Sequence, residues 1–234
     1  MARARGSPGR EGRPLVLDAG SPKAIARAAE VVRRGGVVAL PTETVYGLAA
    51  RTGDRAARAR LARVKGRKEK KPFQVLVSSR PAALRMCGRL PACARELARA
   101  FWPGPLTLVV KGRNGRWLGL RVPDHPVATA LLRRCGGSLV ATSANRAGEN
   151  DAFTATEVIS ALGGRVDVVL DGGAAQRRKP STVVRCDGEN WSILREGAIK
   201  RATIVRLLST RRHGGHGERT ERAEKDRNVK ILKF

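Results

Sequence analysis

Aromatic side chains are scarce in this chain of 234 residues, at 3% of the composition. A surface that stacks nucleic-acid bases on interleaved aromatic rings is therefore not expected. Long apolar runs are also lacking: no segment approaches membrane-spanning length, and the basic start MARARGSPGREGRP has no apolar stretch like that of a signal peptide. We expect a cytoplasmic protein without membrane contact.

Cysteine pairs are lacking as well. The four cysteines are scattered and form no CxxC motif, so we interpret them as small apolar side chains buried in a reducing compartment. His213 and His216 form an HxxH pair among glycines near the C-terminus, which is weak evidence for a metal ion. We predict no metal site built from protein side chains.

Acidic residues are the minority, with 20 Asp and Glu against 47 Lys and Arg and a formal net charge of +27. Residues 1–13 contribute +3 and residues 209–234 contribute +4, so +20 remains on residues 14–208. Residues 14–208 should therefore attract polyanions such as phosphate chains or RNA. The alternative is that most of the arginines are ordinary solvated residues on helix faces.

Strand-like and helix-like patterns alternate along residues 14–208, which predicts one α/β domain with a twisted mixed sheet and helices on both faces. No repeat or linker divides this region. Residues 1–13 are expected to be disordered, and residues 209–234 to form a basic flexible tail. The expected strands are 13–20, 37–40, 73–77, 106–112, 118–122, 138–141, 166–173 and a hairpin over 181–197, and the expected helices are 21–36, 54–64, 81–90, 92–101, 126–137 and 154–164.

Polar residues stand where several of these strands end, a place where α/β sheets collect ligands. The strand VVAL leads into PTET, and the strand SLVA leads into TSAN. Hydroxyl and amide groups in such positions bind phosphate, ribose or amino-acid oxygens, or they form turns with their own backbone. The sequence leaves both interpretations open.

Cations follow the same pattern. Lys65, Arg67 and Lys71 are expected in a loop between a helix and a strand, where a guanidinium fork and ammonium charges suit a triphosphate. The alternative is a solvated charge run at the end of a helix dipole. Arg121 at a strand end suits a carboxylate, with a salt bridge to Asp124 or Glu43 as the alternative. His125 is interpreted as a turn histidine in preference to a general base.

Seven segments occur in the order LPTETVYGL, Lys65-Gly66-Arg67 with Pro72, FWPGPLTLV, LGLRVPDHP, TSAN, DGG with PSTVV, and LREGAI. In this order, and across nearly all of residues 14–208, they resemble the YrdC/TsaC family of L-threonylcarbamoyladenylate synthases. The resemblance implies a twisted α/β fold with a basic concave cleft. Two departures concern the rim of that cleft: Arg177-Arg178-Lys179 replaces a stretch where relatives often carry glycine, and Phe73 replaces a common leucine.

The resemblance implies a nucleotidyltransferase that condenses L-threonine, bicarbonate or CO2, and ATP into threonylcarbamoyl-AMP and pyrophosphate. A threonylcarbamoyl transferase complex would then modify the adenosine beside the anticodon of tRNA, and direct contact with tRNA is a further expectation. Mg²⁺ is expected to accompany ATP, held chiefly by its phosphates.

The resemblance also implies roles for single residues. Lys65 and Arg67 are the expected catalytic cations. The expected ATP-binding residues are Lys65, Arg67, Lys71, Ser143, Asn145 and Arg195, and the expected L-threonine-binding residues are Thr42, Tyr46, Arg121, Thr142 and Ser181.

The sequence is compared with two rival functions, each of which predicts a different set of residues. A non-catalytic RNA-binding protein of the same fold would use the basic body but would not need the hydroxyl and amide set. A carbamoyl-adenylate enzyme of hydrogenase maturation shares a similar domain, but it normally carries acylphosphatase-like and zinc-finger regions, for which this sequence shows no pattern.

Overall fold

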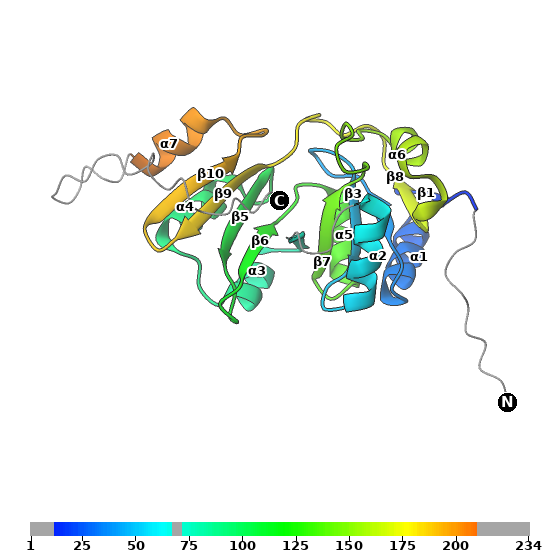
Figure 1. Cartoon of the computed structure of the whole chain (residues 1–234), viewed down its shortest axis with the longest axis horizontal. Coiled ribbons are helices and arrows are strands. Elements are labelled where there is room, and N and C mark those ends of the chain that lie inside the picture. The colour runs from blue at the N-terminus through cyan, green and yellow to red at the C-terminus, as the bar shows by residue number, and fades with distance from the viewer. Residues whose placement is uncertain (1–11, 67–71, 210–234) are drawn as a thin grey trace.

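Ten strands and seven α-helices make up the computed structural model, which describes residues 12–66 and 72–209 (Figure 1). The strands are β1 (Leu15–Asp18), β2 (Val38–Leu40), β3 (Gly47–Arg51), β4 (Gln74–Val77), β5 (Leu106–Lys111), β6 (Trp117–Arg121), β7 (Ser138–Ser143), β8 (Val168–Asp171), β9 (Thr182–Asp187) and β10 (Asn190–Arg195). The helices are α1 (Pro22–Arg33), α2 (Arg55–Lys65), α3 (Arg80–Cys87), α4 (Ala92–Phe101), α5 (Pro126–Arg134), α6 (Ala155–Leu162), the 3-10 helix η1 (Gly163–Arg165) and α7 (Arg201–Ser209).

All ten strands join in one sheet of order β1-β8-β2-β3-β7-β4-β6-β5-β9-β10. The β1–β8, β2–β8, β4–β6 and β5–β9 pairs are parallel, and the remaining pairs are antiparallel. Helices cover both faces, because α1 and α5 pack on one and α2, α3, α4, α6 and α7 pack on the other. The predicted α/β fold with a mixed sheet is therefore confirmed.

The two helices α1 and α5 cover only part of their face. In Figure 1 they lie beside β1, β3, β7 and β8, while β5, β6, β9 and β10 lie on the opposite side of the molecule. Leu76 of β4 packs in the core under α1 and α5, and it pairs in register with Arg121 of β6. Side chains alternate between the faces of a strand, so Gln74 shares this face with Leu76 and Arg121. This is the face that carries the site described below.

Local signals explain how the helices begin and end. Helix α1 starts with Pro22 at its first turn and buries Ile25, Ala29 and Val32. Ser21 occupies the predicted N-cap position, but its side chain makes no capping hydrogen bond. At α2 the predicted cap is confirmed, because the Asp54 carboxylate accepts a hydrogen bond from the backbone of Ala57 at 2.9 Å.

Helix α2 ends one residue later than the sequence indicated. Lys65 is its last residue, and Gly66 forms the left-handed C-cap with φ of 65°. The prediction that placed Lys65 in a loop is therefore wrong. Its side chain leaves from a helix end, which fixes its origin more tightly than a loop would.

Two elements were not predicted. Strand β3 runs antiparallel to β2, with Val38 opposite Ala49, and helix α7 follows the last hairpin. β3 has the sequence GLAAR, which contains no β-branched residue, so strand propensity does not reveal it. Strand β7 also extends to Ser143, two residues further than expected.

The expected tails, 1–13 and 209–234, and with them His213 and His216, lie almost entirely outside the described residues. Cys87, Cys93 and Cys186 are buried as expected, and Cys135 is half-buried. No helix in residues 12–66 or 72–209 has both the length and the apolar character needed to cross a membrane.

Candidate active site

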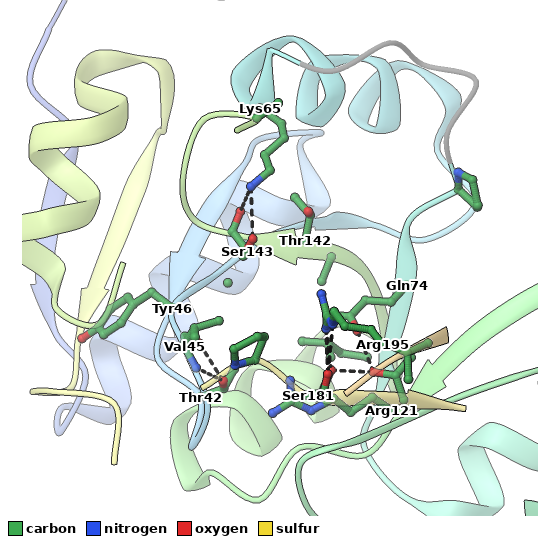
Figure 2. A pocket seen from close by; sticks show the side chains of 18 of the residues that line it. Thr42, Val45, Tyr46, Lys65, Gln74, Arg121, Thr142, Ser143, Ser181 and Arg195 are labelled. Atoms are coloured by element: carbon green, nitrogen blue, oxygen red, sulfur yellow. Dashed lines mark hydrogen bonds between the residues drawn. The ribbon is translucent and has the colours of Figure 1, made fainter. Parts of the chain in front are cut away.

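A cavity of about 270 Å³ opens on the sheet face described above (Figure 2). Its wall is formed by strand ends and by the segments that follow them, from β2, β6, β7 and β10, together with the end of α2. Most of the residues predicted from the sequence meet here. They are Thr42, Tyr46, Lys65, Arg121, Thr142, Ser143, Ser181 and Arg195.

Positive charge dominates this wall. Lys65, Arg121 and Arg195 line the cavity, and no Asp or Glu is among its described lining residues. Burial lowers the pKa of Arg195, the neighbouring charge of Arg121 acts in the same direction, and Asp151 opposes both. Arginine nevertheless stays charged in proteins. Three cations therefore line the described part of the cavity, and one of them, Arg121, is paired with Glu43.

The PTET segment is held by its own hydroxyls. The Thr42 hydroxyl donates to the carbonyl oxygen of Val45 at 2.6 Å and accepts from the backbone N–H of Thr44 at 3.2 Å. Because a hydroxyl has one proton, the 2.9 Å contact between the Thr42 and Thr44 hydroxyls must be donated by Thr44. The turn interpretation of this segment is confirmed for Thr42, which also lines the cavity, while ligand binding by Thr42 stays a prediction.

Tyr46 is one of the residues that line the cavity, and its hydroxyl bonds to the backbone after β8. The hydroxyl donates to the carbonyl oxygen of Gly173 at 2.8 Å and accepts from the N–H of Gly172 at 3.2 Å. In Figure 2 the phenol points away from Thr42 and Ser181. Burial raises the pKa of this phenol. Tyr46 thus ties the PTET segment to the loop after β8.

Arg121 is almost completely buried and is paired with Glu43. Its Nη2 lies 2.8 Å from Glu43 Oε1 and donates to the Thr44 hydroxyl at 2.8 Å, and its Nε donates to the Gly104 carbonyl oxygen at 3.3 Å. Of the two alternative partners, the structure has Glu43 and not Asp124. Neither Glu43 oxygen accepts a regular hydrogen bond from the described residues. The guanidinium is therefore fixed before any ligand arrives.

Lys65 reaches the end of β7. Its Nζ donates to the carbonyl oxygen of Ser143 at 2.9 Å, to the Ser143 hydroxyl at 3.1 Å, and to Oδ1 of Asn145. Asn145 does not line the cavity, and its Nδ2 donates to the carbonyl oxygen of Glu149 at 2.6 Å. In this structure Asn145 therefore holds Lys65 and Ser143 in place. Arg67 and Lys71, the other predicted phosphate-binding cations, lie outside the described residues.

Ser181 and Arg195 meet at the open end of the β9–β10 hairpin. Arg195 donates through Nε and Nη2 to the Ser181 carbonyl oxygen at 3.2 and 2.8 Å, and through Nη2 to the Ser181 hydroxyl at 3.2 Å. The register of the hairpin shifts between Ile193 and Arg195, which is a bulge of the kind that redirects a side chain. The predicted nucleotide and amino-acid residues thus contact each other.

His125 lies outside this cavity. It occupies the N-cap position of α5, makes no capping hydrogen bond there, and has no hydrogen-bond partner for its buried Nδ1 among the described residues. Burial lowers its pKa, which Glu43 and Asp124 oppose. This position agrees with the prediction of a turn histidine.

Sequence reasoning missed two polar residues of the wall, Gln74 and Thr107. The Thr107 hydroxyl donates to Oε1 of Gln74 at 3.0 Å and lies 2.9 Å from the Ser181 hydroxyl. Each is a polar side chain inside an otherwise apolar strand, QVLV or LTLVV. That break in the apolar pattern is the signal that could have identified them.

A family model for Sua5/YciO/YrdC, described as "Telomere recombination", matches residues 30–197. The chain belongs to the Sua5/YciO/YrdC family. The resemblance to this family seen in the sequence is therefore confirmed.

Two relatives of this Sua5/YciO/YrdC chain are named as threonylcarbamoyl-AMP synthases. A putative threonylcarbamoyl-AMP synthase of Mycobacterium tuberculosis is 38% identical over 195 residues, which are 80% of this chain and 89% of that protein. Threonylcarbamoyl-AMP synthase of Bacillus subtilis is 35% identical over 79% of this chain and 56% of that protein. The crystal structure of P. abyssi Sua5 complexed with L-threonine is similar, with a TM-score of 0.75 and 29% identity. That match covers 83% of this chain and 60% of the P. abyssi chain.

Proposed function

We propose that this chain is an enzyme that makes threonylcarbamoyl-AMP, the intermediate used to modify tRNA, from L-threonine, bicarbonate or CO2, and ATP. The observation that carries the proposal is the cavity wall, in which three cations converge beside threonine and serine hydroxyls. The names of the relatives support the same activity. In finer terms, the enzyme is a nucleotidyltransferase that moves AMP from ATP to a carbamate oxygen.

The chemistry requires two anions to meet. The threonine nitrogen adds to CO2 and loses a proton, which gives a carbamate. A carbamate oxygen then attacks the α-phosphorus of ATP, the bond from that phosphorus to the β-phosphate oxygen breaks, and pyrophosphate leaves. Fixed positive groups and positioning lower the barrier to such a step, and no nucleophilic side chain is needed.

Each cation has a place in this scheme. Arg121, fixed by Glu43 and Thr44, binds the threonine carboxylate, and Ser181 binds the amino group. Lys65, at the end of α2 beside Ser143, binds the phosphates. Arg67 and Lys71, which lie outside the described residues, are proposed from the sequence to bind them as well. Arg195 lies next to Ser181, where the carbamate and the α-phosphate meet.

Magnesium is proposed to enter with ATP. The described part of the cavity wall contains no carboxylate, and no group of three or more His, Cys, Asp or Glu side chains in the described residues could hold a metal ion. The phosphates of ATP would therefore supply the oxygen ligands that Mg²⁺ prefers. No step above is assigned to the metal.

The product is an activated acyl donor, so we propose that a threonylcarbamoyl transferase complex takes it and modifies the adenosine beside the anticodon. A non-catalytic RNA-binding role is not favoured, because the relatives are named as synthases.

The test is to incubate the purified protein with ATP, bicarbonate and L-threonine and to detect threonylcarbamoyl-AMP by mass spectrometry, with each substrate omitted in turn. Lys65→Met should lower product formation by about a hundredfold or more, as expected for a lost charge at the reacting groups. Lys23→Met, at an exposed position of α1, is the matched control. Absence of the adenylate from the wild-type reaction would reject the proposal.

A further inference from the structure

We propose that Gln74 and Thr107 orient the Ser181 hydroxyl so that it can only accept a hydrogen bond from a ligand. The cavity would then select a ligand that presents an N–H donor at Ser181. This inference rests on the proposed function for the identity of that ligand, an amino acid. It assigns the selectivity to Gln74 and Thr107, two residues for which the family resemblance implied no role.

Gln74, Thr107 and Ser181 come from β4, from β5 and from the residue before β9, and they share one face of the sheet. Gln74 begins β4, Thr107 is the second residue of β5, and Ser181 immediately precedes β9. Strands β4 and β5 are separated by β6, and Gly119 of β6 is the residue paired with Gln74. Because Gly119 has no side chain, nothing from β6 stands at the position beside Gln74. Thr107 and Ser181 are buried, at 1% and 2% exposure.

The direction of the hydrogen bonds follows from the number of protons. The Thr107 hydroxyl donates its single proton to Oε1 of Gln74, an oxygen that can only accept. The 2.9 Å contact between the Thr107 and Ser181 hydroxyls must therefore be donated by Ser181. Ser181 also accepts from Nη2 of Arg195 at 3.2 Å. Its proton is committed, and one lone pair remains for a ligand.

The other end of Gln74 completes the pattern. Gln74 lines the cavity, and within residues 12–66 and 72–209 no hydrogen-bond partner is recorded for its Nε2. Figure 2 shows its side chain beside Arg195 and Ser181. The amide oxygen of Gln74 accepts the Thr107 proton, and this leaves Ser181 able only to accept from a ligand. The amide nitrogen of Gln74 can donate to an anionic oxygen of the same ligand.

An amino acid fits this arrangement at both ends. Its nitrogen can donate to Ser181, and a carboxylate or carbamate oxygen can accept from Gln74. The nitrogen still carries one N–H after it has become a carbamate, so Ser181 can hold it before and after that step. A ligand that presents only an acceptor at Ser181 makes no hydrogen bond to its hydroxyl oxygen. Both groups still lose their water on binding, so the affinity of such a ligand is much lower.

The experiment compares two ligands by calorimetric titration: L-threonine, and 2-methoxy-3-hydroxybutanoate, in which an acceptor-only ether oxygen replaces the amino group. Thr107→Val removes the hydroxyl at nearly constant shape, so the Ser181 proton becomes available to the ligand. We expect the ratio of the two affinities to fall by about tenfold or more relative to wild type. The added methyl group of the analogue is the same for both proteins and does not affect this change.

Three further variants distinguish the orientation of the Ser181 hydroxyl from a general structural effect of the substitutions. Thr107→Ser keeps the hydroxyl and should keep the wild-type ratio. Gln74→Met removes the acceptor, so Thr107 can donate to Ser181 and the ratio should fall as in Thr107→Val. Gln74→Glu keeps an acceptor for Thr107 and should keep the ratio, while it weakens both ligands because the amide donors are gone.

An unchanged ratio in Thr107→Val, or equal changes in Thr107→Val and Thr107→Ser, would overturn the inference. Threonylcarbamoyl-AMP formation by the wild-type protein is measured alongside. If the adenylate forms and the ratio does not change, only the orientation of Ser181 is wrong. If the wild-type protein neither binds L-threonine nor forms the adenylate, the proposed function fails and this inference fails with it.

Discussion

Oε1 of Glu43 lies 2.8 Å from Nη2 of Arg121, and both side chains are only 3% exposed. Removing one partner of such a pair leaves a buried charge uncompensated. We therefore expect Glu43→Gln, which keeps the shape of the side chain, to lower the free energy of unfolding by about 3 kcal/mol or more. Urea denaturation of the two proteins measures this difference.

The control for that variant is Glu30→Gln. Glu30 pairs with Arg27 and Arg34 on the exposed side of α1. Exposed pairs contribute little to stability, so this change should leave the denaturation midpoint nearly unchanged. If the free energy of unfolding falls equally in Glu43→Gln and Glu30→Gln, the buried Glu43–Arg121 pair contributes no more to stability than an exposed pair.

Tyr46 is the only tyrosine of the chain, so the ultraviolet absorbance of tyrosinate reports on this residue alone. Burial raises the pKa of its phenol, and we expect its titration midpoint to lie above the ordinary tyrosine value of about 10. An unfolded chain loses the proton earlier. The contribution of Tyr46 to stability is therefore complete below about pH 10 and is lost as the pH rises through the folded pKa.

Tyr46→Phe tests the same residue by removal. The variant lacks the two hydrogen bonds to Gly172 and Gly173, so it should lose about 1 kcal/mol of stability at neutral pH. It should also lose less stability than wild type at alkaline pH. A tyrosinate titration of the wild-type protein at the ordinary value would contradict the burial of this phenol.

His125 gives a dependence of the opposite sign. Burial lowers its pKa from 6.5, so below that pH the unfolded chain binds a proton that the folded protein resists. The free energy of unfolding should decrease as the pH falls from about 6.5 through the folded pKa. His125→Asn removes the titration and introduces a good N-cap for α5, which should add about 1 kcal/mol at neutral pH. Thermal unfolding of both proteins between neutral and mildly acidic pH should give diverging curves, and parallel curves would be evidence against this effect.

Gly197 permits a close approach of two backbones. A Cβ at this position would lie 2.2 Å from the Pro180 carbonyl oxygen and 2.7 Å from that of Ser181. Gly197→Ala should therefore displace Ser181, lower the free energy of unfolding by about 2 kcal/mol, and weaken L-threonine binding. Gly20→Ala, where the nearest atom is a carboxylate oxygen of Asp18 at 3.3 Å, is the control. Unaltered L-threonine affinity in Gly197→Ala would mean that the position of Ser181 does not depend on this contact.

The sequence predicted most of the fold because most elements carry strong local signals. Asp54 caps α2, and the predicted hairpin forms with its turn at Gly188 and Glu189, between the paired residues Asp187 and Asn190. Strand β3 was missed because its small residues, Ala49 and Ala50, favour a strand only through burial between β2 and β7. That environment is created by tertiary structure and is not visible in the segment itself.

The site could be predicted only in part, for a similar reason. Motif residues identified the place, and Thr42, Lys65 and Ser181 meet there. The sequence did not reveal that Asn145 accepts a hydrogen bond from Lys65, or that Thr107 donates to Gln74. Hydrogen-bond direction depends on which side chains become neighbours across strands, and no spacing along the chain encodes it.

The β9–β10 hairpin lies at one end of the sheet, and β10 pairs with β9 alone. Ser181 and Arg195 flank its open end, so part of the cavity wall belongs to the hairpin at the edge of the sheet. Fraying at an edge costs less free energy than global unfolding. The time for which a nucleotide stays bound would then depend on how often the β9–β10 hairpin detaches from the sheet. Amide hydrogen exchange in β9 should slow when a ligand occupies the cavity.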